Sequence, residues 1–284
     1  MHLSHVAHLA LLAVVTFTTA CDTSTPTAAT APREDPDEKI WVNLFNGRDL
    51  NNWTVKINGY PAGENAFNTF RVEDGIMQVR YDEYSAFTNQ FGHIFYNGGP
   101  YSHYVLQLEY RFVGEQVNGG PAWAWRNNGI MYHAQSPQEM GVDQDFPACI
   151  EYQLLGGDGE ASRTTANLCT PGTHVVINGE LREDHCINSS SRTYHGDQWV
   201  TVELRVEGNQ LAQHIVDGEV VMEYSGMQLD DGTPLDSGFI ALQAETHPTD
   251  IRAVRLLNLE GCMDEKASNF KSYFVKHDAE ACRY

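Results

Sequence analysis

Basic residues are scarce in this chain. Of its 284 residues, 18 are Lys or Arg and 38 are Asp or Glu, which gives a formal net charge of −20 at pH 7. A surface of this charge repels phosphate backbones and anionic lipid headgroups. Nucleic acid and anionic polysaccharides are therefore poor partners, whereas neutral sugars and small organic substrates stay open. The plainer interpretation of the acidity is that it keeps the protein in solution.

The N-terminal apolar run is too short for a membrane span. It extends from Leu9 to Phe17, which is typical of the core of a signal peptide. Small residues and then Cys21 follow, as in a bacterial lipobox, where the Cys is lipidated and becomes the mature N-terminus. Thr18 stands where a lipobox usually has Leu, and the leader has no Lys or Arg. Secretion with cleavage near Ala20 is therefore the alternative to a lipoprotein held at the cell envelope, in the periplasm or on the outer surface.

We expect four segments along the chain. The leader covers residues 1–21, and a Thr-, Ala-, Pro- and Asp-rich tether without apolar period covers 22–39. A β-sandwich follows over 40–260, and a short Cys-stapled module covers 261–284. The only contact with a membrane in this arrangement is through the lipid anchor at Cys21.

The sequence also lacks an amphipathic helix of ordinary length. Val105–Phe112, Val200–Val206 and Leu211–Val216 instead alternate apolar and polar residues, as half-buried strands do. Asp74-Gly75 and Asp217-Gly218 separate pairs of such runs and predict hairpins. We expect Gly238–Ala244 and Ile251–Leu259 to form a further strand pair, and residues 155–198 to form a long loop insertion with one short extended segment at 174–177. This pattern predicts an all-β, two-sheet antiparallel jelly-roll sandwich.

Cysteines are few, and their spacing does not match a zinc finger. In an exported protein we expect disulfides, namely Cys262–Cys282 around the tail and Cys169–Cys186 around the insertion. Loops of this length contribute on the order of 3 kcal/mol each. Cys149 is left over on a strand, and we interpret it as a small buried apolar residue rather than a nucleophile.

An ordered set of motifs resembles the 3-keto-disaccharide hydrolase domain family. The segment W-V-N-L-F-N-G-R-D-L-N-N-W at Trp41–Trp53 is similar to the family's opening L-F-N-G-x-D-L-x-x-W. Asn127–Tyr132 (N-N-G-I-M-Y) resembles N-S-G-I-x-x-R, with His133 where Arg is common, and E-Y-Q within Cys149–Leu155 resembles E-x-Q-x-L-D. Asp197–Gly218 and Gly238–Leu259 are similar to W-N-x-x-E…H-x-x-N-G and G-x-I-x-L-Q…F-R-N-I-R-I-x-x-L.

The resemblance implies a concanavalin A-like sandwich and cleavage of glycosides that are already oxidised at sugar carbon 3. A ketone at carbon 3 acidifies the proton on carbon 2, so a base can form an enolate and the group on carbon 1 can leave. Such a site needs a base, an enolate stabiliser and an acid. The partner is then a small carbohydrate, a 3-keto glycoside.

Strand geometry and the motif matches give the candidate residues. Positions two apart in a strand share a face, and two carboxylates with amide partners on one concave face could form an acid/base pair. We expect catalytic roles for Glu151, His214, Glu245 and Arg252. We expect substrate contacts from Gln153, Gln243, Asn128, His133, His195 and Trp125. The sequence indicates no definite cofactor, and a set of His and carboxylate groups could hold a divalent metal that polarises the ketone.

Plainer interpretations exist for the same residues. Glu151 and Gln153 could face water from an outer strand, and His214 could be an ordinary strand residue. The tryptophans could pack in the core instead of stacking on a sugar. The main alternative function is a non-catalytic carbohydrate-binding module. An ordinary endoglycosidase ranks last, because the E-x-D-x-E run that we would expect on one strand is missing.

Overall fold

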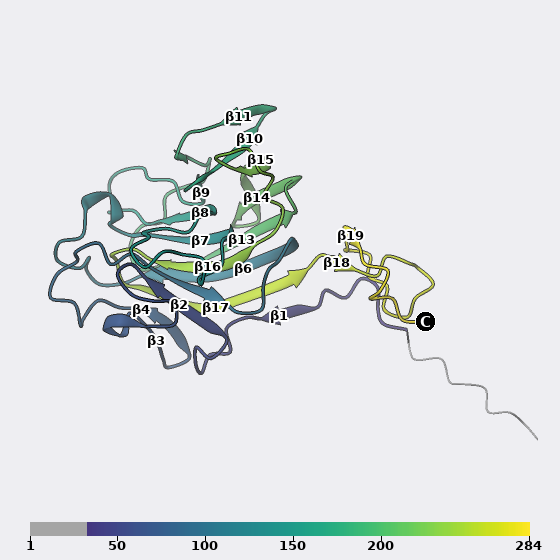
Figure 1. Ribbon diagram of the computed structural model, residues 1–284, viewed down its shortest axis with the longest axis horizontal. Coiled ribbons are helices and arrows are strands. Elements are labelled where there is room, and N and C mark those ends of the chain that lie inside the picture. The colour runs from purple at the N-terminus through teal and green to yellow at the C-terminus, as the bar shows by residue number, and fades with distance from the viewer. Residues whose placement is uncertain (1–32) are drawn as a thin grey trace, which may run out of the picture. The chain divides into compact units, whose positions relative to one another are not determined.

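A computed structural model describes residues 33–284 of the chain. Two antiparallel β-sheets pack face to face, as the alternating sequence pattern predicts, so the sandwich fold is confirmed (Figure 1). Helical structure in the described part is limited to two 3-10 turns, η1 (Ala66–Asn68) and η2 (Ala122–Ala124). Within residues 33–284 we find no helix of the length and hydropathy that a membrane span needs.

The larger sheet has ten strands. They are β1 (Trp41–Asn43), β3 (Phe70–Glu73), β4 (Ile76–Val79), β6 (His103–Phe112), β10 (Thr173–Ile177), β11 (Glu180–Arg182), β13 (Val200–Glu207), β14 (Leu211–Val216), β15 (Glu219–Leu229) and β17 (Thr249–Asn258). Their order is β11-β10-β15-β14-β13-β6-β17-β4-β3, and β1 pairs with β17. Both predicted Asp-Gly hairpins are present in this sheet, and Asp74, Gly75, Asp217 and Gly218 all have positive φ angles, as a type I′ turn requires.

The smaller sheet has seven strands. They are β2 (Trp53–Ile57), β5 (Gly92–Tyr96), β7 (Asn127–Ala134), β8 (Ile150–Leu155), β9 (Asn167–Cys169), β12 (Cys186–Ile187) and β16 (Phe239–Ala244), in the order β12-β9-β8-β7-β16-β5-β2. Its inward-facing side chains, such as Ile130, Tyr152 and Leu242, meet those of the larger sheet in one apolar core. The opposite face of the smaller sheet carries polar side chains together with a second, smaller apolar cluster that includes Phe95, Met131 and Ala241.

One prediction about strand pairing is wrong. β16 and β17 do not pair, because the turn through Pro248 carries the chain from the smaller sheet to the larger one. The loop insertion at 155–198 has its expected extended segment in β10, and it also contains three further short strands: β9 and β12 in the smaller sheet and β11 in the larger. Edge strands of two to five residues are too short to show a clear alternation in sequence.

The cysteine pairing is as predicted. Disulfides join Cys169 to Cys186 and Cys262 to Cys282, and Cys149 is a buried free thiol. The first disulfide links directly opposed positions of β9 and β12.

The C-terminal module contains a small parallel pair, β18 (Glu260–Gly261) and β19 (Lys276–His277), and holds the first residues that the structure describes. The amide of Glu34 donates to the Ser268 carbonyl at 2.9 Å. The buried Lys271 ammonium donates to the Asp35 carbonyl at 2.8 Å and lies 3.1 Å from the Glu34 carboxylate. The candidate lipidation site Cys21, the leader and most of the tether lie outside the described residues.

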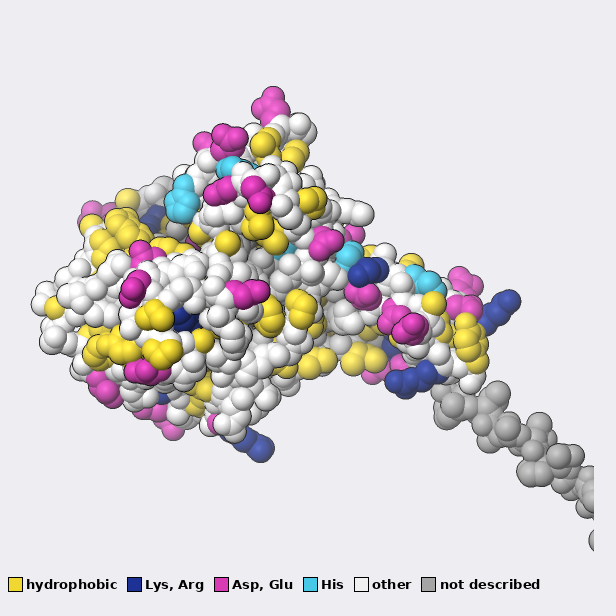
Figure 2. Space-filling view, viewed as in Figure 1, with side chains coloured by type: hydrophobic (Ala, Val, Ile, Leu, Met, Phe, Trp, Pro, Cys, Tyr) yellow, Lys and Arg dark blue, Asp and Glu magenta, His cyan; other side chains and the backbone are white. Residues whose placement is uncertain are grey.

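Acidic side chains are scattered over the visible face rather than gathered in one patch (Figure 2). The face of the described residues seen in this view therefore has no single acidic patch.

Candidate active site

The outward face of the smaller sheet brings four predicted site residues together. Glu151 and Gln153 alternate on β8, and Gln243 and Glu245 alternate along and just beyond β16. β7 lies between these two strands, with Met131 opposite Glu151 on one side and opposite Ala241 on the other. Since neighbouring strands are about 4.8 Å apart, the two carboxyl groups project from strands roughly 10 Å apart onto one surface.

A cavity of about 400 Å³ opens over this face. Its polar lining consists of Asn127, Glu151, Gln153, Arg163, His185 and Glu245, and its apolar lining consists of Trp123, Phe146, Leu155, Pro171 and the Cys169–Cys186 disulfide. The volume lies within the ~300–1,000 Å³ that small-molecule sites occupy.

Both carboxyl groups in this cavity are buried and have raised pKa values. Burial raises the pKa of Glu151 to about 8. Burial raises the pKa of Glu245 well above its usual range, and the Glu151 charge adds to this effect, whereas the Arg163 charge opposes it. Two carboxyl groups that repel each other in one cavity retain a proton at neutral pH. Glu151 has a pKa of about 8, and its charge raises the pKa of Glu245 further. Near pH 8 the pair can therefore supply a Glu151 carboxylate and a Glu245 carboxylic acid at the same time.

Gly129 makes room for the Glu151 carboxyl group. A Cβ atom at position 129 would lie 2.4 Å from Glu151 Oε1 and 2.9 Å from its Cγ. Since these distances are below any ordinary contact, only glycine allows the carboxyl group to lie across β7.

Several buried polar atoms around the two carboxyl groups have no hydrogen-bond partner among the described residues. They are both ring nitrogens of His93, Asn127 Oδ1, Gln243 Oε1 and Glu245 Oε2. His93 lies on β5 directly opposite Gln243, and burial together with the Lys56 charge lowers its pKa to about 3, so its ring is neutral. Buried polar groups are normally paired, so this concentration of unpaired atoms is typical of a surface that receives a polar ligand.

Arg163 comes from the insertion and fixes the loops around the cavity. Its Nη1 group donates to the carbonyl oxygens of Trp125 at 2.6 Å and Gly156 at 2.9 Å, and Nη2 donates to that of Trp123 at 3.3 Å. The sequence did not predict a role for Arg163, because nothing in the polar run around it distinguishes this Arg from an ordinary loop residue. It also missed His93, although the run Gly92–Tyr96 around this His has the composition of a buried strand.

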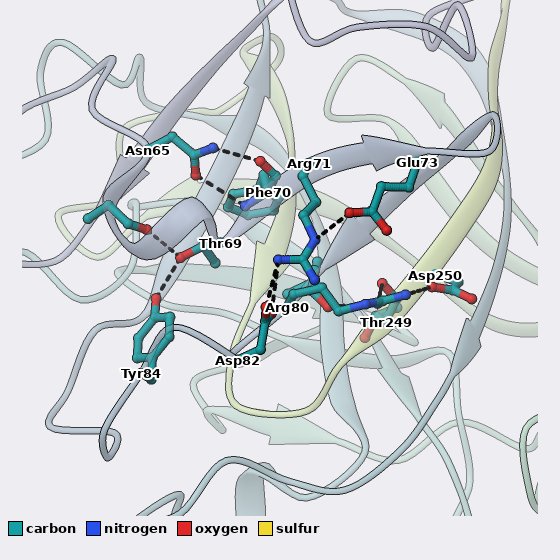
Figure 3. Close-up of polar contacts among 12 residues, drawn as sticks. Asn65, Thr69, Phe70, Arg71, Glu73, Arg80, Asp82, Tyr84, Thr249 and Asp250 are labelled. Atoms are coloured by element: carbon teal, nitrogen blue, oxygen red, sulfur yellow. Dashed lines mark hydrogen bonds and ion pairs between the residues drawn. The ribbon is translucent and has the colours of Figure 1, made fainter.

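An ion-pair network anchors the turn that begins at Glu245 and joins β16 to β17. The Asp250 carboxylate is 2.5 Å from Arg80 Nη2 and 2.7 Å from Arg111 Nη2. Figure 3 shows Arg80 reaching Asp250, next to Arg71, which lies between Glu73 and Asp82. The Thr246 hydroxyl donates to the Ala124 carbonyl at 2.8 Å, which connects this turn to the Trp123 segment.

His214 and Arg252 do not lie on this face, so their predicted placement is wrong. His214 is fully buried between the sheets, where it lies 2.7 Å from the Tyr224 hydroxyl and stacks on Tyr152. Arg252 lies exposed on the outer face of the larger sheet and pairs with Glu109 at 2.8 Å. Strand periodicity assigns residues to alternating faces, but it does not say which face of a sandwich is inside.

The remaining candidates also lie away from the cavity lining. Asn128 points between the sheets and donates to the Gln243 carbonyl at 2.7 Å. His133 is buried with Nε2 3.0 Å from the Gly208 carbonyl oxygen, and His195 accepts the Gly159 amide at 2.9 Å within the insertion. Trp125 packs edge-on against His247, and its neighbour Trp123 lines the cavity instead. Packing places each of these four predicted binding residues outside the cavity lining.

Within residues 33–284, His, Cys, Asp and Glu side chains do not converge in a group of three or more that could hold a metal ion. A divalent metal therefore has no defined ligand set in the described part of the chain.

Comparison with known proteins identifies the family. The sequence model of the 3-keto-alpha-glucoside-1,2-lyase-like domain matches residues 40–257. The chain belongs to this family. The family's name connects the domain with carbohydrates. This agrees with a cavity of sugar size that has polar side chains in its lining. No curated protein matches the sequence.

Solved structures with a related sandwich include three carbohydrate-related proteins. A glycosyl hydrolase candidate from Parabacteroides distasonis has 15% identity and a TM-score of 0.46, with 77% of this chain and 94% of that chain covered. A protein from work on endo-acting O-glycanases of the human gut microbiota has 14% identity and a TM-score of 0.49, with 78% and 98% covered. Carbohydrate-binding module CBM66 from Bacillus subtilis has 10% identity and a TM-score of 0.43, with 73% and 96% covered.

Proposed function

We propose that this lyase-like domain cleaves 3-keto glycosides by removing the proton on sugar carbon 2. The observation that carries the proposal is the pair of buried carboxyl groups, Glu151 and Glu245, in one cavity with both pKa values raised. A base with a pKa near neutrality removes a carbon acid's proton most effectively, and a neutral carboxylic acid can protonate a leaving oxygen. The family's name supports this chemistry.

The elimination can be written with the two carboxyl groups alone. The Glu151 carboxylate takes the carbon 2 proton, and the electrons of that C–H bond become the double bond between carbons 1 and 2. The bond from carbon 1 to the glycosidic oxygen breaks, and the oxygen leaves with the electron pair and takes the proton of Glu245. The products are an unsaturated 3-keto sugar and the free alcohol. Glu151 has gained the carbon 2 proton and Glu245 has given its own proton to the alcohol, so the pair keeps its total charge.

Water addition to the unsaturated sugar completes a hydrolysis. A water molecule that adds its oxygen to carbon 1 and a proton to carbon 2 gives the free 3-keto sugar. The protonated Glu151 can return its proton to carbon 2, and Glu245 can accept the proton of the water, which restores the starting protonation of both groups.

The remaining polar atoms suit binding of the sugar. Gln153 accepts a hydrogen bond from Asn167 at 3.3 Å through Oε1, so its Nε2 group is free to donate to the ketone oxygen, where negative charge develops. The unpaired Asn127 Oδ1 atom, in the cavity lining, can accept from a sugar hydroxyl group.

The test uses a 3-keto glucoside and its unoxidised parent as substrates for the full mature chain. We expect cleavage of the keto sugar alone, with a slower rate when carbon 2 carries deuterium. Glu151→Gln and Glu245→Gln should each reduce kcat/KM by about 10²–10⁴-fold. The matched control is Arg252→Gln, on the outer face of the other sheet, which should keep full activity. Full turnover in both Glu variants would disprove this site assignment.

A carbohydrate-binding module is the second candidate. It is favoured by one observation, the exposed Trp123 ring at the cavity edge, since aromatic platforms bind sugar faces. Binding of both sugars without cleavage of either would support this function and contradict the lyase.

We also propose that the protein is exported and held at the cell envelope by lipid on Cys21, on the sequence alone. Palmitate should label the wild type and leave Cys21→Ala unlabelled. Equal labelling of the two would contradict the anchor.

A further inference from the structure

We infer that the cavity takes a single sugar ring together with an apolar, flat aglycone, so that the substrates are 3-keto glycosides of aromatic alcohols. This inference rests on the proposed function, and it concerns the part of the cavity that surrounds the leaving group. It makes the domain selective against a leaving group that is itself a sugar.

The polar capacity of the cavity is enough for about one sugar. Asn127, Glu151, Gln153 and Glu245 offer their side chains to a ligand, and they lie together on the floor formed by β7, β8 and the end of β16. Arg163 adds little, because its guanidinium group already donates to the carbonyl oxygens of Trp123, Trp125 and Gly156 in two surrounding segments. Hydroxyl groups beyond the first ring would therefore meet few partners.

The walls above this floor are apolar. Leu155, Pro171, Phe146 and the Cys169–Cys186 disulfide face the cavity, and none of their side chains can donate a hydrogen bond. His185 is the exception on this side. A second sugar placed here would lose the hydration of its hydroxyl groups without replacing it, which weakens binding, whereas an apolar group would gain from burial.

Trp123 provides a flat platform at the cavity edge. Its ring is 56% exposed and stacks on Phe91 with 5.9 Å between centroids, and Phe91 in turn packs on Phe146 at 5.0 Å. The Trp123 carbonyl accepts from Arg163, so the ring is held by both its backbone and its neighbours. An exposed indole kept in place without a partner on one face is suited to stacking with an aromatic ring.

The platform lies on the same side of the cavity as the proposed acid. The Thr246 hydroxyl, next in sequence to Glu245, donates to the carbonyl of Ala124, next in sequence to Trp123. An aglycone stacked on Trp123 would thus have its oxygen near the group that protonates it. This arrangement connects the aromatic platform with the leaving group rather than with the sugar ring.

The experiment compares two 3-keto glucosides whose leaving alcohols have similar acidity. One carries benzyl alcohol, and the other carries glucose attached through its primary hydroxyl group. We expect kcat/KM to be at least 10-fold higher for the benzyl compound. Trp123→Ala should remove most of this difference, mainly through KM. Leu181→Ala, an exposed apolar residue on β11 outside the cavity, should preserve it.

Calorimetry with the unoxidised benzyl glucoside and the unoxidised disaccharide separates this inference from the proposed function. We expect tighter binding of the benzyl compound to the wild type, and loss of that preference in Trp123→Ala. Equal cleavage and equal binding of the two ligands would overturn the aromatic aglycone while leaving the lyase in place. Absence of cleavage with a clear binding preference would overturn the lyase and support the aromatic site.

Discussion

The position of one carboxyl group depends on the absence of a side chain at residue 129. The Glu151 carboxyl group lies across β7 in the space that a Cβ atom of residue 129 would occupy. No carboxylate can keep this position over an alanine, so the geometry of the acid/base pair is set by two residues on neighbouring strands.

We expect Gly129→Ala to reduce kcat/KM at least 10-fold, because Glu151 must move away from its present position. Gly141→Ala is the matched control, since the nearest atom to a Cβ there is 3.8 Å away. Steady-state kinetics of both variants, with circular dichroism to verify folding, check this. Unchanged activity in Gly129→Ala would show that the Glu151 position is not needed.

The raised pKa of Glu151 also predicts a pH dependence of stability. The folded protein holds this proton up to about pH 8, whereas the unfolded chain releases it near pH 4.5. The stabilising effect of the bound proton is therefore complete below pH 4.5 and is lost as the pH rises toward 8, by up to about 1.4 kcal/mol per pH unit. Glu151→Gln should thus gain stability relative to the wild type between pH 5 and pH 8.

Denaturant unfolding of both proteins across this pH range measures the effect. The difference between them is the relevant quantity, because the buried His93 and His214, with pKa values lowered to about 3, destabilise both proteins below pH 6.5. A difference that does not change between pH 5 and pH 8 would contradict the raised pKa.

At this scale, local periodicity predicted part of the candidate site. The four residues Glu151, Gln153, Gln243 and Glu245 lie on one face because alternation along a strand is a local property. Whether that face is inside or outside depends on the second sheet, which is a long-range property. His214 was therefore misplaced into the site from the core, and Arg252 from the opposite outer surface.

At the scale of elements, the crossing from β16 to β17 begins at Glu245 and takes the chain from the smaller sheet to the larger one. Its far end is fixed by Asp250, whose carboxylate is almost fully buried and bonded to two arginines. The sequence predicted both strands but paired them, because a short polar turn usually joins neighbours in one sheet.

Asp250→Ala should destabilise the protein by about 2–3 kcal/mol, since it leaves two partly buried guanidinium groups without their carboxylate. It should also lower activity, because the turn after Glu245 loses its anchor. Arg252→Gln removes an exposed ion pair from the same strand and should cost less than about 1 kcal/mol. Urea unfolding measures the loss of stability in both variants. Equal losses in the free energy of unfolding would contradict the anchoring role of Asp250.

Apart from the segment in β10, the short strands of the insertion at residues 155–198 could not be predicted from the sequence. Its short strands extend both sheets through pairing with distant residues, and the disulfide between β9 and β12 closes the cavity wall. The cysteine pairing was predictable from spacing. The strands β9, β11 and β12 were not, because their hydrogen bonds depend on edges formed elsewhere in the chain.

At the scale of the whole molecule, the C-terminal module holds the N-terminal segment 33–37. The buried Lys271 is central to this contact, which also includes the Ser272 hydroxyl donating to Asp37 at 2.6 Å. We expect Lys271→Ala to speed proteolysis within residues 33–40 while kcat/KM stays within twofold of the wild type. Lys276→Ala, which removes an exposed ion pair with Glu260, is the matched control and should leave the cleavage rate unchanged.

The contact between segment 33–37 and the module determines how the protein bears tension. A pull on the chain at Arg33 first loads the hydrogen bonds to residues 265–272, which lie within a ring closed covalently by Cys262–Cys282. These contacts take up the force before β1 does. Because the module follows directly on β17, a force applied at Arg33 would enter the sandwich first through the end of β17, and through β1 only after these contacts break.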